Sequence, residues 1–84
     1  MRDTKYAREI ATGAHRDFRI ERLYIHEVHR PEIRFSWWPE GKFAPRPLDV
    51  TEDELLPLFQ DAISKGVFTE AFLGQLRESL DLRY

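Results

Sequence analysis

The spacing of apolar residues changes at Leu48, and this change limits the possible folds more than any other feature of the chain. From Phe18 to Leu48, apolar and polar residues mostly alternate, which is typical of half-buried β-strands. After Leu48, apolar residues recur every three or four positions, as they do on one face of an α-helix. A chain that places its strands before its helices is expected to form an α+β fold.

Three antiparallel strands are expected between residues 18 and 48, as a β-meander. Their sequences are RIERLYIHEVH, EIRFSWW and KFAPRPL. Pro31 separates the first two strands because it cannot donate a ladder hydrogen bond and restricts the residue before it. Pro45 and Pro47 lie two residues apart, so both missing amides face the same side, which favours an edge position for the third strand.

Two helices are expected between residues 49 and 80, joined as a helical hairpin. Thr51 begins a T-x-x-E capping box, and Gly66 is expected to end the first helix. Thr69 is the expected cap of the second helix. We expect the hairpin to cover one face of the sheet and residues 81–84 to form a tail.

A short helix is also expected at the N-terminus, within residues 1–17. Asp3 can cap it, and Gly13 is expected to end or weaken it. The apolar residues with helical spacing are Tyr6, Ala7, Ile10 and Ala14. With 84 residues, the chain is expected to form one small domain, 1–84.

The turn Pro39-Glu40-Gly41 sets the expected pairing of the second and third strands. As a three-residue loop with its glycine in the left-handed conformation, it places Trp38 opposite Lys42 and Trp37 opposite Phe43. Alternation then assigns one apolar face to the core: Ile33, Phe35, Trp37 and Phe43. The opposite, outer face carries Arg34, Ser36, Trp38, Lys42, Ala44 and Arg46.

The first strand is expected to add to this outer face. If Leu23 and Ile25 point toward the core, the residues that alternate with them point outward. These residues are Arg22, Tyr24, His26 and Val28. The residues that we predict to contact a partner are Arg22, Tyr24, His26, Arg34, Trp38, Lys42 and Arg46.

Three interpretations of the outer face are open. In the first interpretation, the outer face is the solvated side of a sheet, with Trp38 beneath Lys42 and neighbouring arginines. Alternatively, it binds another protein or a second copy as a homodimer, because Trp, Tyr and Arg are enriched in interface hot spots. In the third interpretation it binds nucleic acid, through Arg34, Trp38, Lys42 and Arg46. We expect a non-catalytic protein-interaction or accessory module, with nucleic-acid binding as the alternative.

The charge of the chain is divided unevenly. Residues 1–47 hold ten Lys/Arg and seven Asp/Glu, a net charge of +3, whereas residues 48–84 hold three and eight, a net charge of −5. The outer face belongs to the basic half, but the whole chain has a net charge of −2. This acidic total weakens the nucleic-acid interpretation.

No residue pattern indicates catalysis. The segment His26-Glu27-Val28-His29 lacks the i, i+4 spacing of a zinc-protease helix, and on a strand its two imidazoles point to opposite faces. The chain has no cysteine, and its serines lie in no nucleophile-elbow pattern. We predict no enzyme activity, no cofactor and no metal, with a small enzyme or metal-binding protein as a minor alternative.

The absence of cysteine and of long apolar runs bears on location. A chain without cysteine fits a reducing compartment. No apolar run approaches the roughly 18 residues of a membrane span. We therefore predict a cytoplasmic protein without a membrane partner.

Overall fold

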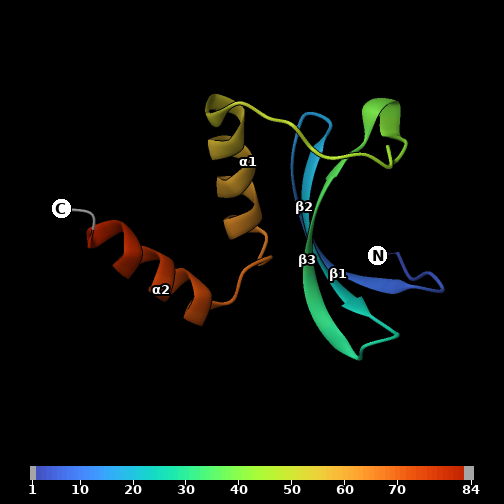
Figure 1. The fold of residues 1–84 in the computed structure, drawn as a ribbon, viewed down its shortest axis with the longest axis horizontal. Coiled ribbons are helices and arrows are strands. Elements are labelled where there is room, and N and C mark those ends of the chain that lie inside the picture. Colours follow the sequence, from blue (N-terminus) through green and yellow to red (C-terminus); the bar gives the residue numbers. More distant parts are fainter. Residues whose placement is uncertain (1, 83–84) are drawn as a thin grey trace.

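The computed structural model describes residues 2–82 and confirms the α+β class. Within these residues a three-stranded antiparallel sheet, in the order β1-β2-β3, precedes two helices (Figure 1). The elements are β1 (Ala7–His15), β2 (Phe18–Ile25), β3 (Arg30–Trp37), a short 3-10 turn (Pro39–Gly41), α1 (Glu52–Ser64) and α2 (Glu70–Asp81). That residues 1–84 form a single domain stays a prediction.

The predicted N-terminal helix is wrong, because residues 7–15 form strand β1. The pairing of β1 with β2 shifts between Glu9 and Ala11, leaving Ile10 as a bulge. A bulge breaks the two-residue alternation of a strand, so the apolar residues acquired a spacing that suggested a helix. The meander therefore begins at residue 7, and β2 is its central strand.

The third predicted strand, within KFAPRPL, is also wrong. In the described part of the chain this segment pairs with the sheet at one bridge, between Trp37 and Ala44. Glu40 adopts a left-handed backbone conformation (φ 54°), as does the glycine after it. The turn therefore uses one more residue than expected, and the partner of Trp37 changes from Phe43 to Ala44. Phe43 packs edge-on against Trp38, with ring centroids 5.6 Å apart.

Both predicted C-terminal helices are confirmed, with their caps. The Thr51 hydroxyl accepts a hydrogen bond from the Glu54 amide at 3.3 Å, and the Thr69 hydroxyl accepts one from the Phe72 amide at 3.2 Å. The predicted tail begins within α2, which ends at Asp81, and residues 83–84 lie outside the described part. Neither helix has the length and apolar composition needed to cross a membrane.

The helical hairpin does not cover the sheet as expected. Helix α1 packs against β1 and β2, whereas α2 contributes Leu73 to the margin of the core and then extends away from the sheet (Figure 1). The buried core cluster is formed by β2, α1 and the connection between α1 and α2, and consists of Ile20, Leu58, Ala62, Val67 and Phe68. Strand β3 consequently has no helix packed over it.

Strand β1 and helix α1 approach each other closely at one point. A Cβ atom added to Gly13 would lie 2.7 Å from Ala62 Cβ and 2.5 Å from the Ala62 amide nitrogen. Beside this point, the Ala14 amide donates a 2.7 Å hydrogen bond to Asp61 Oδ2. Gly13 is therefore required by packing and does not end a helix, as the sequence suggested.

Asp61 makes the stability of the fold depend on pH in the acid range. The hydrogen bond from Ala14 and the nearby ammonium group of Lys65 lower its pKa from the ordinary value of 3.8. Because the folded pKa is the lower one, this stabilisation is complete above about pH 4 and is lost as the pH falls through the folded pKa. Asp61→Asn should lower the free energy of unfolding by about 1 kcal/mol at pH 7. Urea titrations from pH 7 to 2 should also show a shallower acid loss than in the wild type, and an unchanged acid limb would contradict this role.

Candidate protein-binding groove

The structure divides the seven predicted partner-binding residues between different surfaces. Arg34 and Trp38 lie on the sheet face opposite α1, as expected. Arg22 pairs with Ile33 across β2 and β3, and Tyr24 pairs with Pro31, so both lie on the helix-facing side. The placement of Arg22 and Tyr24 on the outer face was therefore wrong.

The remaining three residues are also dispersed. His26 lies just after β2, where its Nε2 is 3.0 Å from Asp3 Oδ1. Arg46 lies over the ring of Trp37, 4.3 Å from its centroid, and so belongs to the Trp37 side of the sheet. Lys42 is exposed directly after the 3-10 turn. The predicted seven-residue binding face is thus not formed.

The error arose from Leu23, which is buried but faces away from α1. Leu23 pairs with Glu32, on the same side as Arg34 and Ser36, and it lines a small pocket with Arg2 and Ala7. Arg22 points toward the helices instead, and its Nε donates a 2.7 Å hydrogen bond to the Val67 carbonyl. The N-terminal segment covers part of the outer face, so an apolar residue there is buried without contacting α1.

Trp38 is covered by cations of its own chain. The guanidinium carbons of Arg19 and Arg2 lie 4.0 Å and 4.7 Å from its ring centroid. Such contacts contribute about 0.5–1 kcal/mol each at exposed sites. They agree with the solvated-face interpretation, although the cations are not Lys42, and they leave less of the ring available for a base or a protein.

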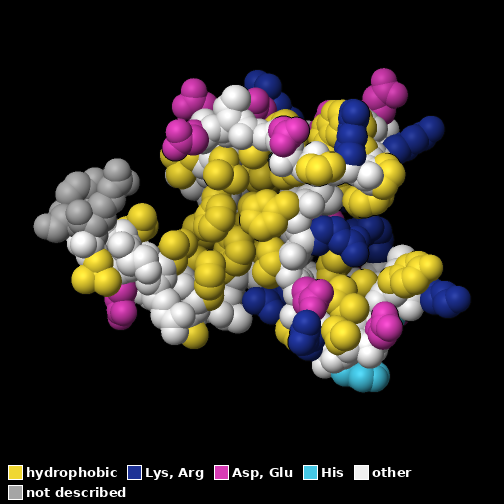
Figure 2. All heavy atoms as spheres, in the orientation of Figure 1, with side chains coloured by type: hydrophobic (Ala, Val, Ile, Leu, Met, Phe, Trp, Pro, Cys, Tyr) yellow, Lys and Arg dark blue, Asp and Glu magenta, His cyan; other side chains and the backbone are white. Residues whose placement is uncertain are grey.

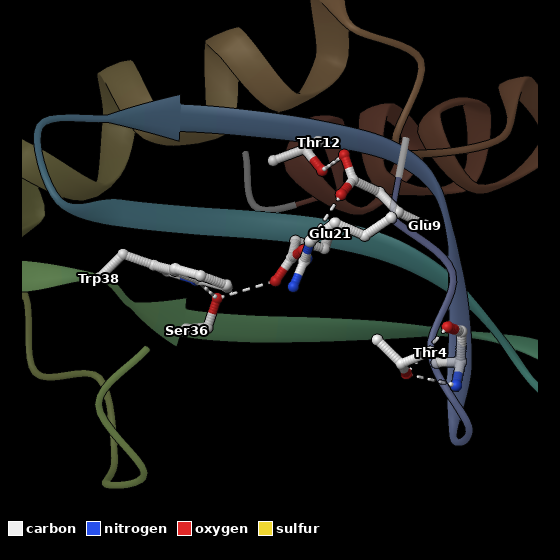
Figure 3. A network of polar contacts seen from close by, with 8 residues as sticks. Thr4, Glu9, Thr12, Glu21, Ser36 and Trp38 are labelled. Carbon is white, nitrogen blue, oxygen red and sulfur yellow. Dashed lines mark hydrogen bonds and ion pairs between the residues drawn. The ribbon is translucent and has the colours of Figure 1, made fainter. Parts of the chain in front are cut away.

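A polar network connects Trp38 to a buried carboxylate, Glu21. Ser36 Oγ donates to Glu21 Oε1 at 3.0 Å and accepts from Trp38 Nε1 at 2.9 Å, as Figure 3 shows. Arg2 forms an ion pair with the other Glu21 oxygen. Glu21 has no exposed surface, so these donors replace the water that its charge would otherwise bind.

Glu9 extends this network along the same face. It accepts hydrogen bonds from Arg2 at 2.8 Å and from Thr12 at 2.8 Å. Burial raises the pKa of the Glu9 carboxyl, but the bonds from Arg2 and Thr12 outweigh burial and hold the pKa below its ordinary value. Glu9 and Glu21 both pair with Arg2, so their charges offset one another. The outer face is therefore a structural network.

An exposed apolar surface lies on the other side, between β3 and the helices. It is an open groove of about 330 Å³ lined by Arg22, Ile33, Phe35, Phe59, Phe68 and Phe72. The exposed fractions of Phe35 and Phe72 are 49% and 44%. In Figure 2, hydrophobic side chains gather in this region, between the two helices and β3.

Aromatic stacking holds the helical wall of the groove. Phe59 of α1 stacks on Phe68, with centroids 4.8 Å apart, and Phe68 contacts Phe72 of α2 at 5.2 Å. Each such pair contributes about 0.5–1.5 kcal/mol beyond area burial. The wall is therefore held in place before any partner binds.

The outer edge of β3 borders this groove with free backbone groups. The Trp38 amide bonds the Asp17 carbonyl across β2 and β3, and the Trp37 carbonyl accepts from Ala44 on the outer side. Because backbone groups alternate in direction along a strand, the amides and carbonyls of Ile33 and Phe35 point outward. Within residues 2–82 this edge pairs only at its end, through the Trp37–Ala44 bridge.

The sequence assigned two of the groove residues, Ile33 and Phe35, to the core and placed Arg22 on the outer face. Phe59 and Phe72 belong to the apolar residues that recur every three or four positions after Leu48, a spacing that predicts the buried face of a helix. One signal of excess apolar surface was present: the stripe of the second helix continues to Leu80, further than a short sheet needs. The structure leaves Leu80 59% exposed.

Metal sites and relatives give no independent indication of function. Among residues 2–82, no group of three or more His, Asp or Glu side chains is arranged to hold a metal ion. Comparisons with protein-family models, curated proteins and solved structures found no match to this chain. The geometry of the groove therefore has to carry the functional interpretation.

Proposed function

We propose that the protein is a non-catalytic protein-interaction module whose binding surface is the groove between β3 and the helices. The observation that carries this proposal is the pre-formed aromatic wall beside a strand edge that is unpaired at Ile33 and Phe35. Phe35 and Phe72 expose large apolar areas there, and gathered apolar exposure is typical of interaction sites. This surface replaces the outer sheet face that the sequence favoured.

The groove favours an extended segment with apolar side chains as its partner. Such a segment can hydrogen-bond to the outward amides and carbonyls of Ile33 and Phe35, adding a strand to the sheet. Alternate side chains of the added strand would then point into the groove, against Phe68 and Phe72. Backbone pairing provides affinity in this binding mode, and the aromatic wall provides selection for apolar side chains.

Nucleic-acid binding through Arg34, Trp38, Lys42 and Arg46 stays the alternative, with less support. Arg46 lies with Trp37 on the helix-facing side, and Trp38 is beneath Arg2 and Arg19. The four residues do not form one continuous stacking surface. The cytoplasmic location, the absence of catalysis and the minor enzyme or metal alternative also stay predictions.

Site-specific photo-cross-linking tests the proposed surface. A benzophenone amino acid in place of Phe35 should give one discrete adduct in cells, with the cross-link mapped by mass spectrometry to an extended apolar segment. Tyr6, which is 75% exposed and distant in sequence, is the matched aromatic control and should give no such adduct. Adducts from position 6 and none from position 35 would show that the groove is not the binding surface.

A further inference from the structure

We infer that the segment which binds the groove edge is β3 of a second copy, paired antiparallel about a two-fold axis at Ile33. This inference rests on the proposed function, because it names the partner of the same surface. Strand β3 has the required chemistry, because the side chains on its helix-facing side are all apolar: Pro31, Ile33, Phe35 and Trp37. Two edges joined in this way would form one continuous six-stranded sheet.

The charges of β3 are self-complementary about two centres: Pro31, which places Arg30 opposite Glu32, and Ile33, which places Glu32 opposite Arg34. Glu32 and Arg34 flank Ile33, so antiparallel pairing centred on Ile33 places each Glu32 opposite the Arg34 of the other copy. Both side chains are exposed on the face away from the helices. As a pair without mutual backbone hydrogen bonds, they approach closely, and opposite charges there contribute about 0.2–1 kcal/mol.

Neighbouring registers are unfavourable. Since only odd-numbered residues direct backbone groups outward, the pairing can shift only in steps that keep odd residues opposite odd ones. A shift centred on Arg34 places Arg34 opposite Arg34, and one centred on Glu32 places Glu32 opposite Glu32. Like charges directly opposite destabilise a strand pair. Charge therefore leaves the registers centred on Pro31 and Ile33. The Pro31 register would lose both central hydrogen bonds because proline has no N–H, so the Ile33 register is favoured.

The backbone hydrogen bonds agree with this register and limit the length of the paired segment. Two hydrogen bonds would join the Ile33 residues, and each Phe35 amide would donate to the opposite Pro31 carbonyl. Pro31 has no N–H, so the reverse bond at that pair is missing. Beyond Phe35, the Trp37 carbonyl is already bonded to Ala44. The pairing is thus restricted to a short segment, which would cover the exposed side chains of Ile33 and Phe35.

Cysteine cross-linking tests the register directly, because the chain contains no cysteine. Ile33→Cys should form a disulfide-linked dimer under mild oxidation, since Cα atoms of such a pair lie about 5.5 Å apart, within the range of a disulfide. Phe35→Cys is the matched control: its copies would be separated by about 13 Å along the strand and should stay unlinked. Equal linking at positions 33 and 35, or none at 33, would overturn the inference.

Charge exchange provides a second measurement that needs no disulfide. E32R alone places two arginines opposite each other, R34E alone places two glutamates opposite each other, and each should weaken the dimer about tenfold or more. Mixed in equal amounts, they restore both opposite-charge pairs and should form a heterodimer in sedimentation experiments. Circular dichroism confirms that each variant is folded. A mixture as monomeric as its components would overturn the inference.

The homodimer and the proposed function can fail separately. A wild-type monomer at high concentration, together with a position-35 adduct to a different protein, would overturn the homodimer and keep the groove as a binding surface. A monomer with no position-35 adduct would overturn both. A disulfide-linked dimer of the Ile33→Cys variant, together with a position-35 adduct to a second copy, would support both.

Discussion

Replacing Gly13 with alanine is expected to lower the free energy of unfolding by about 3 kcal/mol, toward the upper end of overpacking effects. The added Cβ would lie 2.5 Å from the backbone nitrogen of Ala62, and a helix backbone cannot yield as a flexible side chain can. Relieving the clash requires α1 to move away from β1 and would open the contact with Ile20. Thermal denaturation followed by circular dichroism should show a melting temperature lower by roughly 12–24 °C.

Gly74 is the matched control for this prediction. It lies inside α2, and a Cβ there would meet nothing within 4 Å. Gly74→Ala should raise the free energy of unfolding by about 0.5–1 kcal/mol, because alanine favours the helix over the unfolded chain. Similar effects of the two substitutions would show that the close approach of Gly13 and Ala62 does not limit stability.

Replacing Ser36 with alanine is expected to cost about 2–3 kcal/mol, because two groups lose a partner at once. The buried Glu21 carboxylate loses one of its donors, and the Trp38 indole loses its acceptor. Since Glu21 has no exposed surface, water replaces the missing hydroxyl only if the network opens. Urea unfolding measures the loss. The combined emission of Trp37 and Trp38 in the folded variant should shift to longer wavelength as the Trp38 indole gains contact with water.

Ser79 is the matched serine for that experiment. Its hydroxyl donates to the Gln75 carbonyl at 3.0 Å on an exposed face of α2. Ser79→Ala should change the free energy of unfolding by less than about 0.5 kcal/mol, as surface substitutions usually do. If Ser36→Ala were equally mild, the Glu21 network would be better described as solvated than as buried.

The location of the candidate site was decided by the N-terminal segment. The sequence correctly placed Ile33, Phe35 and Trp37 on one side of β3 and Arg34, Ser36 and Trp38 on the other, because alternation is a local property of a strand. It then proposed the wrong side for binding. Because β1 occupies one edge of β2 and Arg2 lies over the outer face, that face is a closed polar network, and the exposed apolar surface is on the helix-facing side.

The sequence by itself determined the two C-terminal helices and their position after the strands. Thr51, Gly66 and Thr69 act on backbone groups within a few residues, so their meaning could be read without knowing the rest of the fold. Only the tertiary structure decided three further points: that residues 7–15 form a bulged strand, that Leu23 is buried away from α1, and that α2 leaves β3 uncovered. Each of these depends on pairing or packing between residues distant in sequence, and local spacing does not encode such contacts.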